Sequence, residues 1–175
     1  MSIWSILFGH AMAAQPNVNV GQPALSFALP AINESVALDT VRSNRVALSD
    51  FTGPLPREPR TAVVVHFFDQ STAGNTLTGL NRLQKKYVNK DVQVIGISTD
   101  EGSMASLSTW IEDLNLKFPV LRDGHQVVLN RYGFDSLPFT MIVDTDGFIF
   151  AMGNPTGSDF EAAVTAEIVP LIETE

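Results

Sequence analysis

Cysteine is absent from all 175 residues of this chain. Without thiols the chain can form no disulfide, no cysteine-based zinc site and no thiolate nucleophile. A hydroxyl or a carboxamide cannot replace the thiolate in thiol–disulfide exchange, because neither forms a mixed disulfide with a substrate. The sequence therefore excludes thiol chemistry by the chain's own side chains. It leaves the compartment open, since oxidising and reducing surroundings both suit a protein without thiols.

Basic side chains are scarce as well. The chain has 11 lysine and arginine residues against 19 aspartate and glutamate residues, which gives a net charge of −8. Nucleic acids and anionic lipids need a basic surface, so neither is expected as the main partner. We interpret the one local basic cluster as the solvated face of a helix. It comprises Arg82, Lys85, Lys86 and Lys90.

Patterns of metal ligands are also missing. The three histidines, His10, His66 and His125, are far apart and show no His-x-x-x-His spacing. Residues 144–147 (DTDG) resemble the start of a calcium loop, but the glutamate that closes such a loop is absent. The Asp-Gly pair in this segment instead favours a hairpin turn. We expect neither a metal nor another cofactor.

The apolar run at the N-terminus, residues 3–8, is far shorter than the about 20 residues that span a bilayer. Residues 11–13 (AMA) resemble a small-x-small cleavage site, but no positive charge precedes the run. We interpret residues 1–19 as an apolar arm that serves as an interfacial anchor, a weak signal-like segment or a docking segment. The arm favours an extracytoplasmic or membrane-associated location, with a cytoplasmic location as the alternative. Residues 20–175 are predicted to form one domain.

Alternating patterns within that domain predict strands and helices in turn. Residues 61–68 and 92–98 have the composition of strands that are covered on both faces. Helical spacing of apolar residues follows each strand, and Ser103 is a candidate N-cap of the second helix. Two strands around the Asp-Gly turn form a terminal hairpin. The expected helices cover residues 77–87, 104–114, 127–132 and 160–172, and Pro170 is expected to kink or end the last of them.

Two further segments precede the first buried strand. Residues 36–48 contain two β-favouring runs around residues 42–45 and predict an N-terminal β-hairpin. Residues 54–60 (PLPREPR) hold three prolines and cannot join a central sheet, so they predict an exposed, stiff loop. The whole order predicts an α/β fold with a central mixed sheet, helices on both faces and an N-terminal β-hairpin extension.

This order and the motifs within it resemble the thioredoxin-like superfamily, and more narrowly its redoxin branch of TlpA-like and AhpC/TSA-type proteins. Residues 61–75 are similar to the strand and active-site turn of these proteins, except that the cysteines are missing. The resemblance runs from about residue 20 to the C-terminus and implies a thioredoxin-like fold. The motifs that carry it include GQPA (21–24), LSDF (48–51), VIGISTD (94–100), FPVLRD (118–123) and LPFT (137–140).

The resemblance also implies where a family active site would lie. In a TlpA-like register, Thr72 and Asn75 occupy the two positions of the family's Cys-x-x-Cys pair. In a peroxiredoxin-like register, Asn75 alone replaces the reactive cysteine. Pro138 resembles the cis-proline beside a thioredoxin active site, which favours the TlpA-like register. On this interpretation Thr72, Asn75 and Pro138 are degenerate active-site positions.

Ordinary structural roles also account for these residues. Thr72 is expected to cap the helix after the strand, and polar side chains at such a position need no further function. As a nucleophile, Thr72 would need a base within hydrogen-bond reach. His66 is expected to point to the opposite side of the sheet, and Asp69 is either a weak base or a buried acid. We therefore predict no catalytic residue and no enzyme.

The function predicted from the sequence is that of a redox-inactive, thioredoxin-like protein. Such a protein would bind other proteins as a structural or assembly subunit of a larger complex, for example one at a membrane. Two alternatives remain: a family member with non-thiol activity, or a binder of peptides or small molecules in the vacant active-site groove. The expected binding surface comprises Leu137 and Phe139, the loop residues Pro54, Pro56, Arg57, Pro59 and Arg60, and the arm residues Trp4 and Phe8.

Overall fold

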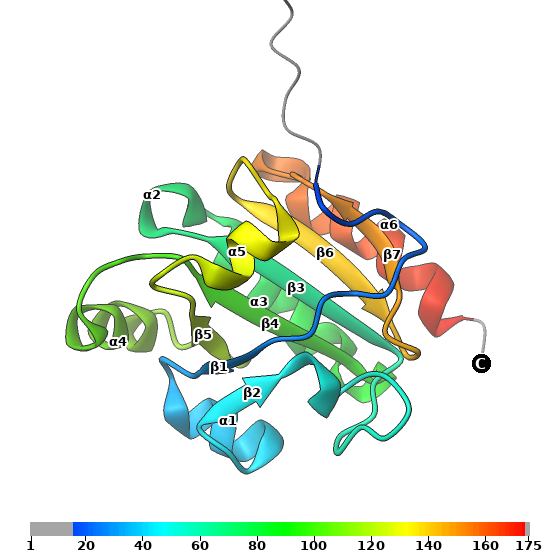
Figure 1. Cartoon of the computed structure of the whole chain (residues 1–175), viewed down its shortest axis with the longest axis horizontal. Helices are drawn as coiled ribbons and strands as arrows, with labels where there is room; N and C mark the ends of the chain where they lie inside the picture. The colour runs from blue at the N-terminus through cyan, green and yellow to red at the C-terminus, as the bar shows by residue number, and fades with distance from the viewer. Residues whose placement is uncertain (1–15, 174–175) are drawn as a thin grey trace, which may run out of the picture.

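The computed structural model describes residues 16–173 of the chain. A five-stranded sheet forms its centre, with the strand order β5-β4-β3-β6-β7 (Figure 1). β3 pairs with β4 in parallel and with β6 in antiparallel orientation, so the predicted mixed sheet is confirmed. Its strands are β3 (Ala62–Phe68), β4 (Val92–Ser98), β5 (Val120–Arg122), β6 (Phe139–Asp144) and β7 (Ile149–Gly153).

Helices cover both faces of this sheet, as predicted. α3, α4 and α6 bury their apolar residues in one core, whereas α1 and α5 bury theirs in the core on the other face. Residues 16–173 also form the short 3-10 turns η1 (Leu48–Asp50), η2 (Val88–Lys90) and η3 (Gly157–Asp159). The helices are α1 (Glu34–Val41), α2 (Gln70–Ala73), α3 (Thr76–Tyr87), α4 (Met104–Asp113), α5 (Val127–Tyr132) and α6 (Phe160–Ile172).

The central strand β3 divides its side chains between the two cores. Val63, Val65 and Phe67 belong to the core under α5, and Val64 and Phe68 belong to the core under α3 and α6. Successive side chains of a strand point to opposite faces, which explains this alternation. Every residue of β3 is buried, as expected for a central strand covered on both faces.

A pair of short antiparallel strands, β1 (Ala28–Pro30) and β2 (Arg45–Ala47), precedes the central sheet. The predicted N-terminal β extension is therefore confirmed, but the strand expected to start at residue 36 was wrong. Those residues lie in α1, because Ala37 and Val41 are four positions apart and a helix buries both on one face. Arg42 ends this helix with a left-handed backbone, at φ 58°.

The first described residues pack along the domain. The Asn17 N–H donates to the Tyr132 carbonyl at 2.8 Å, and the Asn17 amide Nδ2 donates to the Arg131 carbonyl at 3.0 Å. Gly133 ends α5 at φ +71°, and a Cβ atom placed on it would lie 2.9–3.0 Å from atoms of Asn17. This position therefore requires glycine both for its backbone conformation and for the close approach of Asn17.

We expect Gly133→Ala to destabilise the protein by about 1–2 kcal/mol through the left-handed backbone alone. The loss should be larger still because Asn17 must move away. Gly157→Ala is the matched control, since its φ is +75° and an added Cβ meets no atom within 4 Å. Urea denaturation of both variants gives the comparison. Equal losses of unfolding free energy would show that the Asn17 contact imposes no constraint.

Candidate functional site

The candidate site lies where β3 ends and β6 begins. The antiparallel register places Phe67 opposite Phe139, so the loop that contains Pro138 adjoins the turn after Phe68. The Leu137–Pro138 peptide bond is cis, as the resemblance implied. Asn154 fixes this loop, because its Nδ2 atom donates to the Pro138 carbonyl at 2.9 Å and contacts the Ser136 Oγ at 3.1 Å.

Leu137 leaves its peptide groups available in this loop. Its side chain is half-buried, while its backbone N–H and C=O make no hydrogen bond to any other residue of the described part of the chain. Phe139, also expected at the binding surface, is 7% exposed and stacks on Phe134, with ring centroids 3.8 Å apart. The backbone of Leu137, rather than the ring of Phe139, is therefore the part of this loop that can pair with an extended chain.

Thr72 belongs to the short helix α2, which Asp69 caps. The Thr72 N–H donates to Asp69 Oδ1 at 2.8 Å, and the Asp69 N–H donates to Thr72 Oγ1 at 3.0 Å. This reciprocal capping box makes Thr72 the third helical residue, so the expectation that Thr72 itself is the N-cap was wrong. Its hydroxyl oxygen lies 3.0 Å from the Asp69 N–H nitrogen and 3.3 Å from the Asp69 carbonyl oxygen, so it is engaged with the Asp69 backbone.

Asp69 stays ionised beside this turn. Partial burial by itself would raise the pKa of the Asp69 carboxyl, but hydrogen bonds from Ser71 and Thr72 outweigh it and lower the pKa below its usual value. Hydrogen bonds that favour the charged form act in this direction. The interpretation of Asp69 as a buried acid is therefore corrected: it is a partly exposed, ionised helix cap.

Asn75 is exposed and occupies the N-cap position of α3 without a capping bond from its side chain. Gly74, at φ 43° and ψ −131°, separates it from α2, so Thr72 and Asn75 lie on two different helices. The N-terminal end of α3 adjoins a cleft of about 230 Å³. The lining of this cleft includes Asn75, Gly79, Phe160 and an ion pair between Arg82 and Glu161.

His66 connects the two sides of the candidate site, which are β6 after the Leu137 loop and α3 after the Thr72–Asn75 turn. The expectation that it points to the opposite side of the sheet was wrong. It shares the strand parity of Val64 and Phe68, so it faces α3 and α6 rather than the opposite side of the sheet. Its ring nitrogens lie 2.9 Å from Thr140 Oγ1 and 3.1 Å from Thr76 Oγ1. Neither threonine was singled out from the sequence. The alternation along β3 was the signal that could have identified Thr76 as a neighbour.

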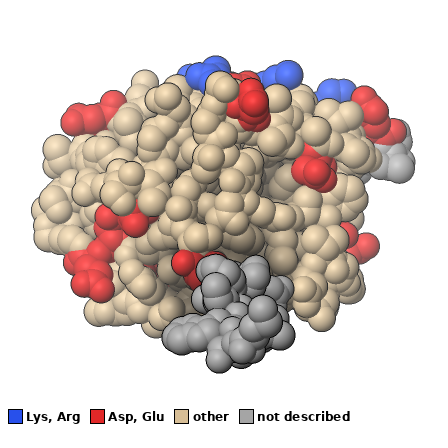
Figure 2. Space-filling model, turned by 90° about the horizontal axis from the view of Figure 1, so that it is seen from above, with Lys and Arg blue, Asp and Glu red and all other residues tan. Residues whose placement is uncertain are grey.

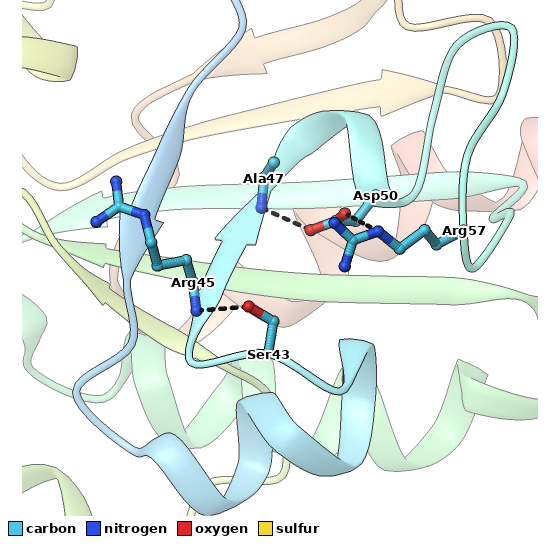
Figure 3. Close-up of polar contacts among 5 residues, drawn as sticks. All are labelled: Ser43, Arg45, Ala47, Asp50 and Arg57. Atoms are coloured by element: carbon cyan, nitrogen blue, oxygen red, sulfur yellow. Dashed lines mark hydrogen bonds and ion pairs between the residues drawn. The ribbon is translucent and has the colours of Figure 1, made fainter.

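The proline-rich loop lies away from this site. Residues 54–60 precede β3 and the Thr72 turn follows it, so the two segments lie at opposite ends of that strand. The loop has no helix or strand, as predicted, and is tied to the domain (Figure 3). Arg57 Nε lies 3.3 Å from Asp50 Oδ1, and Asp50 Oδ2 also accepts from the Ala47 N–H at 2.8 Å.

The remaining members of the expected surface are not assembled into one patch. Pro54 and Pro59 are exposed, and Pro56 is half-buried. Arg60 is also half-buried and reaches Asp91 at 3.8 Å. Trp4 and Phe8 lie outside the described residues. The turn with Thr72 and Asn75 follows β3, and the loop with Leu137 and Pro138 precedes β6, so the two segments lie at the same end of this strand pair, whereas the loop 54–60 lies at the other end.

We also searched the described residues for charged patches, groups of metal ligands and membrane-spanning helices. Figure 2 shows a face on which uncharged residues predominate, with scattered carboxylates and with basic side chains along one edge. Within residues 16–173, no three histidine, aspartate or glutamate side chains are grouped as metal ligands. Over the same residues, every helix is too short or too polar to cross a bilayer.

Comparison with known proteins identifies the family. The profile of the AhpC/TSA family matches residues 20–152. The chain belongs to the AhpC/TSA family. The thiol-disulfide oxidoreductase ResA of Bacillus anthracis is 35% identical to it over 68 residues. That match spans 39% of this chain and 39% of ResA, well under two thirds of the relative's length.

Solved structures show the same fold. A protein of Chlorobium tepidum described as the thiol:disulfide interchange protein DsbE has a TM-score of 0.73 at 20% identity, covering 89% of this chain and 99% of its own. Peroxidoxin BcpB of Mycobacterium tuberculosis has a TM-score of 0.66 at 18% identity, covering 89% and 97%. The predicted thioredoxin-like fold is confirmed.

These findings correct the function predicted from the sequence. The AhpC/TSA relatives carry the names of thiol-disulfide oxidoreductases, which point to redox function and contradict a redox-inactive structural or assembly subunit. The two alternatives, non-thiol activity and a vacant-groove binder, fit the relatives no better. The error arose because the loss of one reactive group does not say which reaction the rest of a site serves. The absence of cysteine itself stands.

Proposed function

We propose that this protein takes part in thiol–disulfide exchange and that the reacting sulfur atoms belong to its substrates. It binds a cysteine-containing segment of another protein beside Leu137 and promotes the exchange of that cysteine with a second thiol or disulfide. The family to which the chain belongs and the names of its relatives support a redox role. The absence of cysteine requires the sulfur to come from elsewhere.

The chemistry balances without a group from this chain. A thiolate of one substrate attacks a disulfide sulfur of the other, a new sulfur–sulfur bond forms, and the second sulfur leaves as a thiolate. The protein's part is to hold one sulfur near the Thr72–Asn75 turn in a fixed orientation. The first-turn N–H groups of α3 lie there, and the N-terminal end of a helix favours a thiolate over a thiol.

The observation that carries the proposal is the unpaired backbone of Leu137. A peptide N–H and C=O with no partner among residues 16–173, in a half-buried loop, can form main-chain hydrogen bonds with an extended polypeptide. The resemblance places the family's reactive residues in the turn after β3, and the strand register puts this loop at the same end of the sheet. An extended segment paired at Leu137 would therefore carry its side chains past Thr72 and Asn75. Backbone pairing of this kind suits protein substrates of varied sequence.

The test uses an extended peptide with one cysteine, held as a mixed disulfide with a chromogenic thiol. Glutathione releases the chromophore, and absorbance follows the rate with and without the protein. We expect saturable acceleration of about tenfold, equivalent to about 1.4 kcal/mol of transition-state stabilisation. The same peptide, N-methylated on both sides of the cysteine, should show no acceleration. A rate that stays at the background value for both peptides would contradict the proposal.

A further inference from the structure

The fully buried imidazole of His66 is the most unusual polar group in the described core. Its ring stacks on Phe68 at 5.8 Å between centroids and meets the edge of Phe160 at 5.5 Å. Transfer of an imidazole from water into such surroundings is unfavourable unless its hydrogen bonds are replaced. Both ring nitrogens have partners, Thr140 on β6 and Thr76 on α3. These two hydrogen bonds are what a histidine supplies here and an apolar residue would not.

The hydrogen-bond partners fix where each proton lies. The Thr76 hydroxyl donates to the Ala73 carbonyl at 2.5 Å, so the Thr76 oxygen must accept from the Nε2–H of His66. A neutral imidazole has only one N–H, so Nδ1 is an acceptor, and the Thr140 hydroxyl donates to it. Burial lowers the pKa of His66 to about 3, which keeps the ring neutral near pH 7. One continuous chain runs from Thr140 through His66 and Thr76 to Ala73.

This chain of hydrogen bonds spans the candidate site. Thr140 lies two residues after Pro138 in β6, and Ala73 and Thr76 bracket Gly74 and Asn75. One end therefore fixes the strand that carries the Leu137 loop, and the other end fixes the turn between α2 and α3. The imidazole is the rigid element between the two walls. In this series of hydrogen bonds each hydroxyl donates once, so all the donors point the same way, from Thr140 towards Ala73.

We propose that His66 is a positioning residue of the candidate site, which sets the spacing between the Leu137 loop and the Thr72–Asn75 turn through Thr140 and Thr76. This inference rests on the proposed function. His66 touches no substrate, because it is fully buried. Its effect passes through the two threonines to the backbone on either side of the bound segment. A spacing error of 1 Å between such walls is enough to lower a rate about 100-fold.

The variants Thr140→Val and Thr76→Val test this role, because valine keeps the shape of threonine and removes its hydroxyl. Thr52→Val is the matched control: Thr52 is buried, its hydroxyl donates to the Leu48 carbonyl, and it lies in the segment after η1. We expect each site variant to lower the peptide exchange rate about tenfold at saturating peptide, with Thr52→Val unchanged. All rates are measured where urea titrations show each variant folded.

Substitutions of His66 separate positioning from packing. His66→Gln retains one donor and one acceptor and should keep most of the exchange rate, whereas His66→Leu fills the space without hydrogen bonds and should lose it. Should His66→Leu fail to fold, the two threonine variants still decide the question. Site variants that exchange as fast as Thr52→Val would overturn the positioning role while leaving the proposed function intact.

A second readout does not depend on exchange activity. Asn75→Cys places the chain's only thiol at the N-cap of α3, and the pH dependence of its alkylation gives the thiol pKa. Adding Thr76→Val or Thr140→Val should raise this thiol pKa, because the first turn of α3 and its N–H groups shift. Adding Thr52→Val should not. A raised pKa without any peptide exchange by the wild type would support positioning and refute the proposed function. An unmoved pKa in the site variants would overturn positioning.

Discussion

Lowering the pH from 7 to 4.5 should destabilise this protein by about 2.5 kcal/mol through His66 alone. Burial lowers the pKa of His66 from 6.5 to about 3, so the folded protein keeps the ring neutral over this range. The unfolded chain binds a proton at this residue once the pH falls below about 6.5. The contribution of His66 to the free energy of unfolding is therefore fully present above pH 6.5 and is lost progressively as the pH falls towards 3.

The size of this effect is set by the structure around the ring. The imidazole is enclosed by Phe68 and Phe160, and its two hydrogen bonds satisfy the neutral form. A protonated ring would need two acceptors and would carry a charge without water. Asp69 also makes the protein less stable in acid. Its pKa is lowered in the folded protein, so its contribution to the free energy of unfolding is lost when the carboxylate is protonated, at a more acidic pH than for His66.

The measurement is urea denaturation at steps from pH 7 to pH 4.5 for the wild type and His66→Gln. We expect His66→Gln to be the less stable protein at pH 7 and to lose less stability on acidification. His125→Gln, the same substitution at an exposed histidine, is the matched control. Identical pH profiles for the wild type and His66→Gln would show that the buried ring is not the source of acid sensitivity.

Restoring a cysteine pair with Thr72→Cys and Asn75→Cys should produce thiol–disulfide oxidoreductase activity in a protein that has no thiol. Asn75 is exposed at the N-cap of α3, where a thiol pKa is lowered and the thiolate becomes reactive. Thr72 is half-buried in the preceding turn and would supply the resolving thiol. The loss of its hydroxyl from the Asp69 capping box should destabilise the protein by about 1 kcal/mol.

The readout is the dithiothreitol-dependent reduction of a protein disulfide. We expect the double variant to reduce the disulfide about 100-fold faster than a control cysteine pair does, which is equivalent to about 3 kcal/mol of activation free energy. Ser103→Cys with Ser106→Cys is that control, because it has the same spacing at the start of a different helix, α4. Asn75→Cys alone should react once without turnover. A folded double variant that forms no disulfide and reduces no substrate would show that the site has lost more than its thiols.

The fold was largely predictable because its signals are local. The valine-rich run of β3, the helical spacing after it and the Asp-Gly turn between β6 and β7 each lie within a few consecutive residues. The failure at α1 shows the limit of this reasoning. Valine and threonine in residues 36–41 favour a strand by composition, but burial of Ala37 and Val41 on one face selects a helix.

The candidate site was predictable only in part. The turn at Thr72 and Asn75 and the cis peptide bond at Pro138 followed from the resemblance to a known family, whereas their capping arrangement did not. Aspartate and threonine are both common N-cap residues, so either Asp69 or Thr72 could begin the helix, and the residue at which α2 starts makes Asp69 the N-cap. That start depends on where β3 ends, which is set by its pairing with β4 and β6.

The sequence by itself determined the absence of a thiol and the order of strands and helices, because composition and short-range periodicity need no knowledge of distant contacts. The tertiary structure alone decided the direction of His66 and its partners. Thr76 is 10 residues away and Thr140 is 74 residues away, and their meeting depends on strand register and on the packing of α3. A shift of one residue in the register of β3 would turn His66 to the opposite face of the sheet.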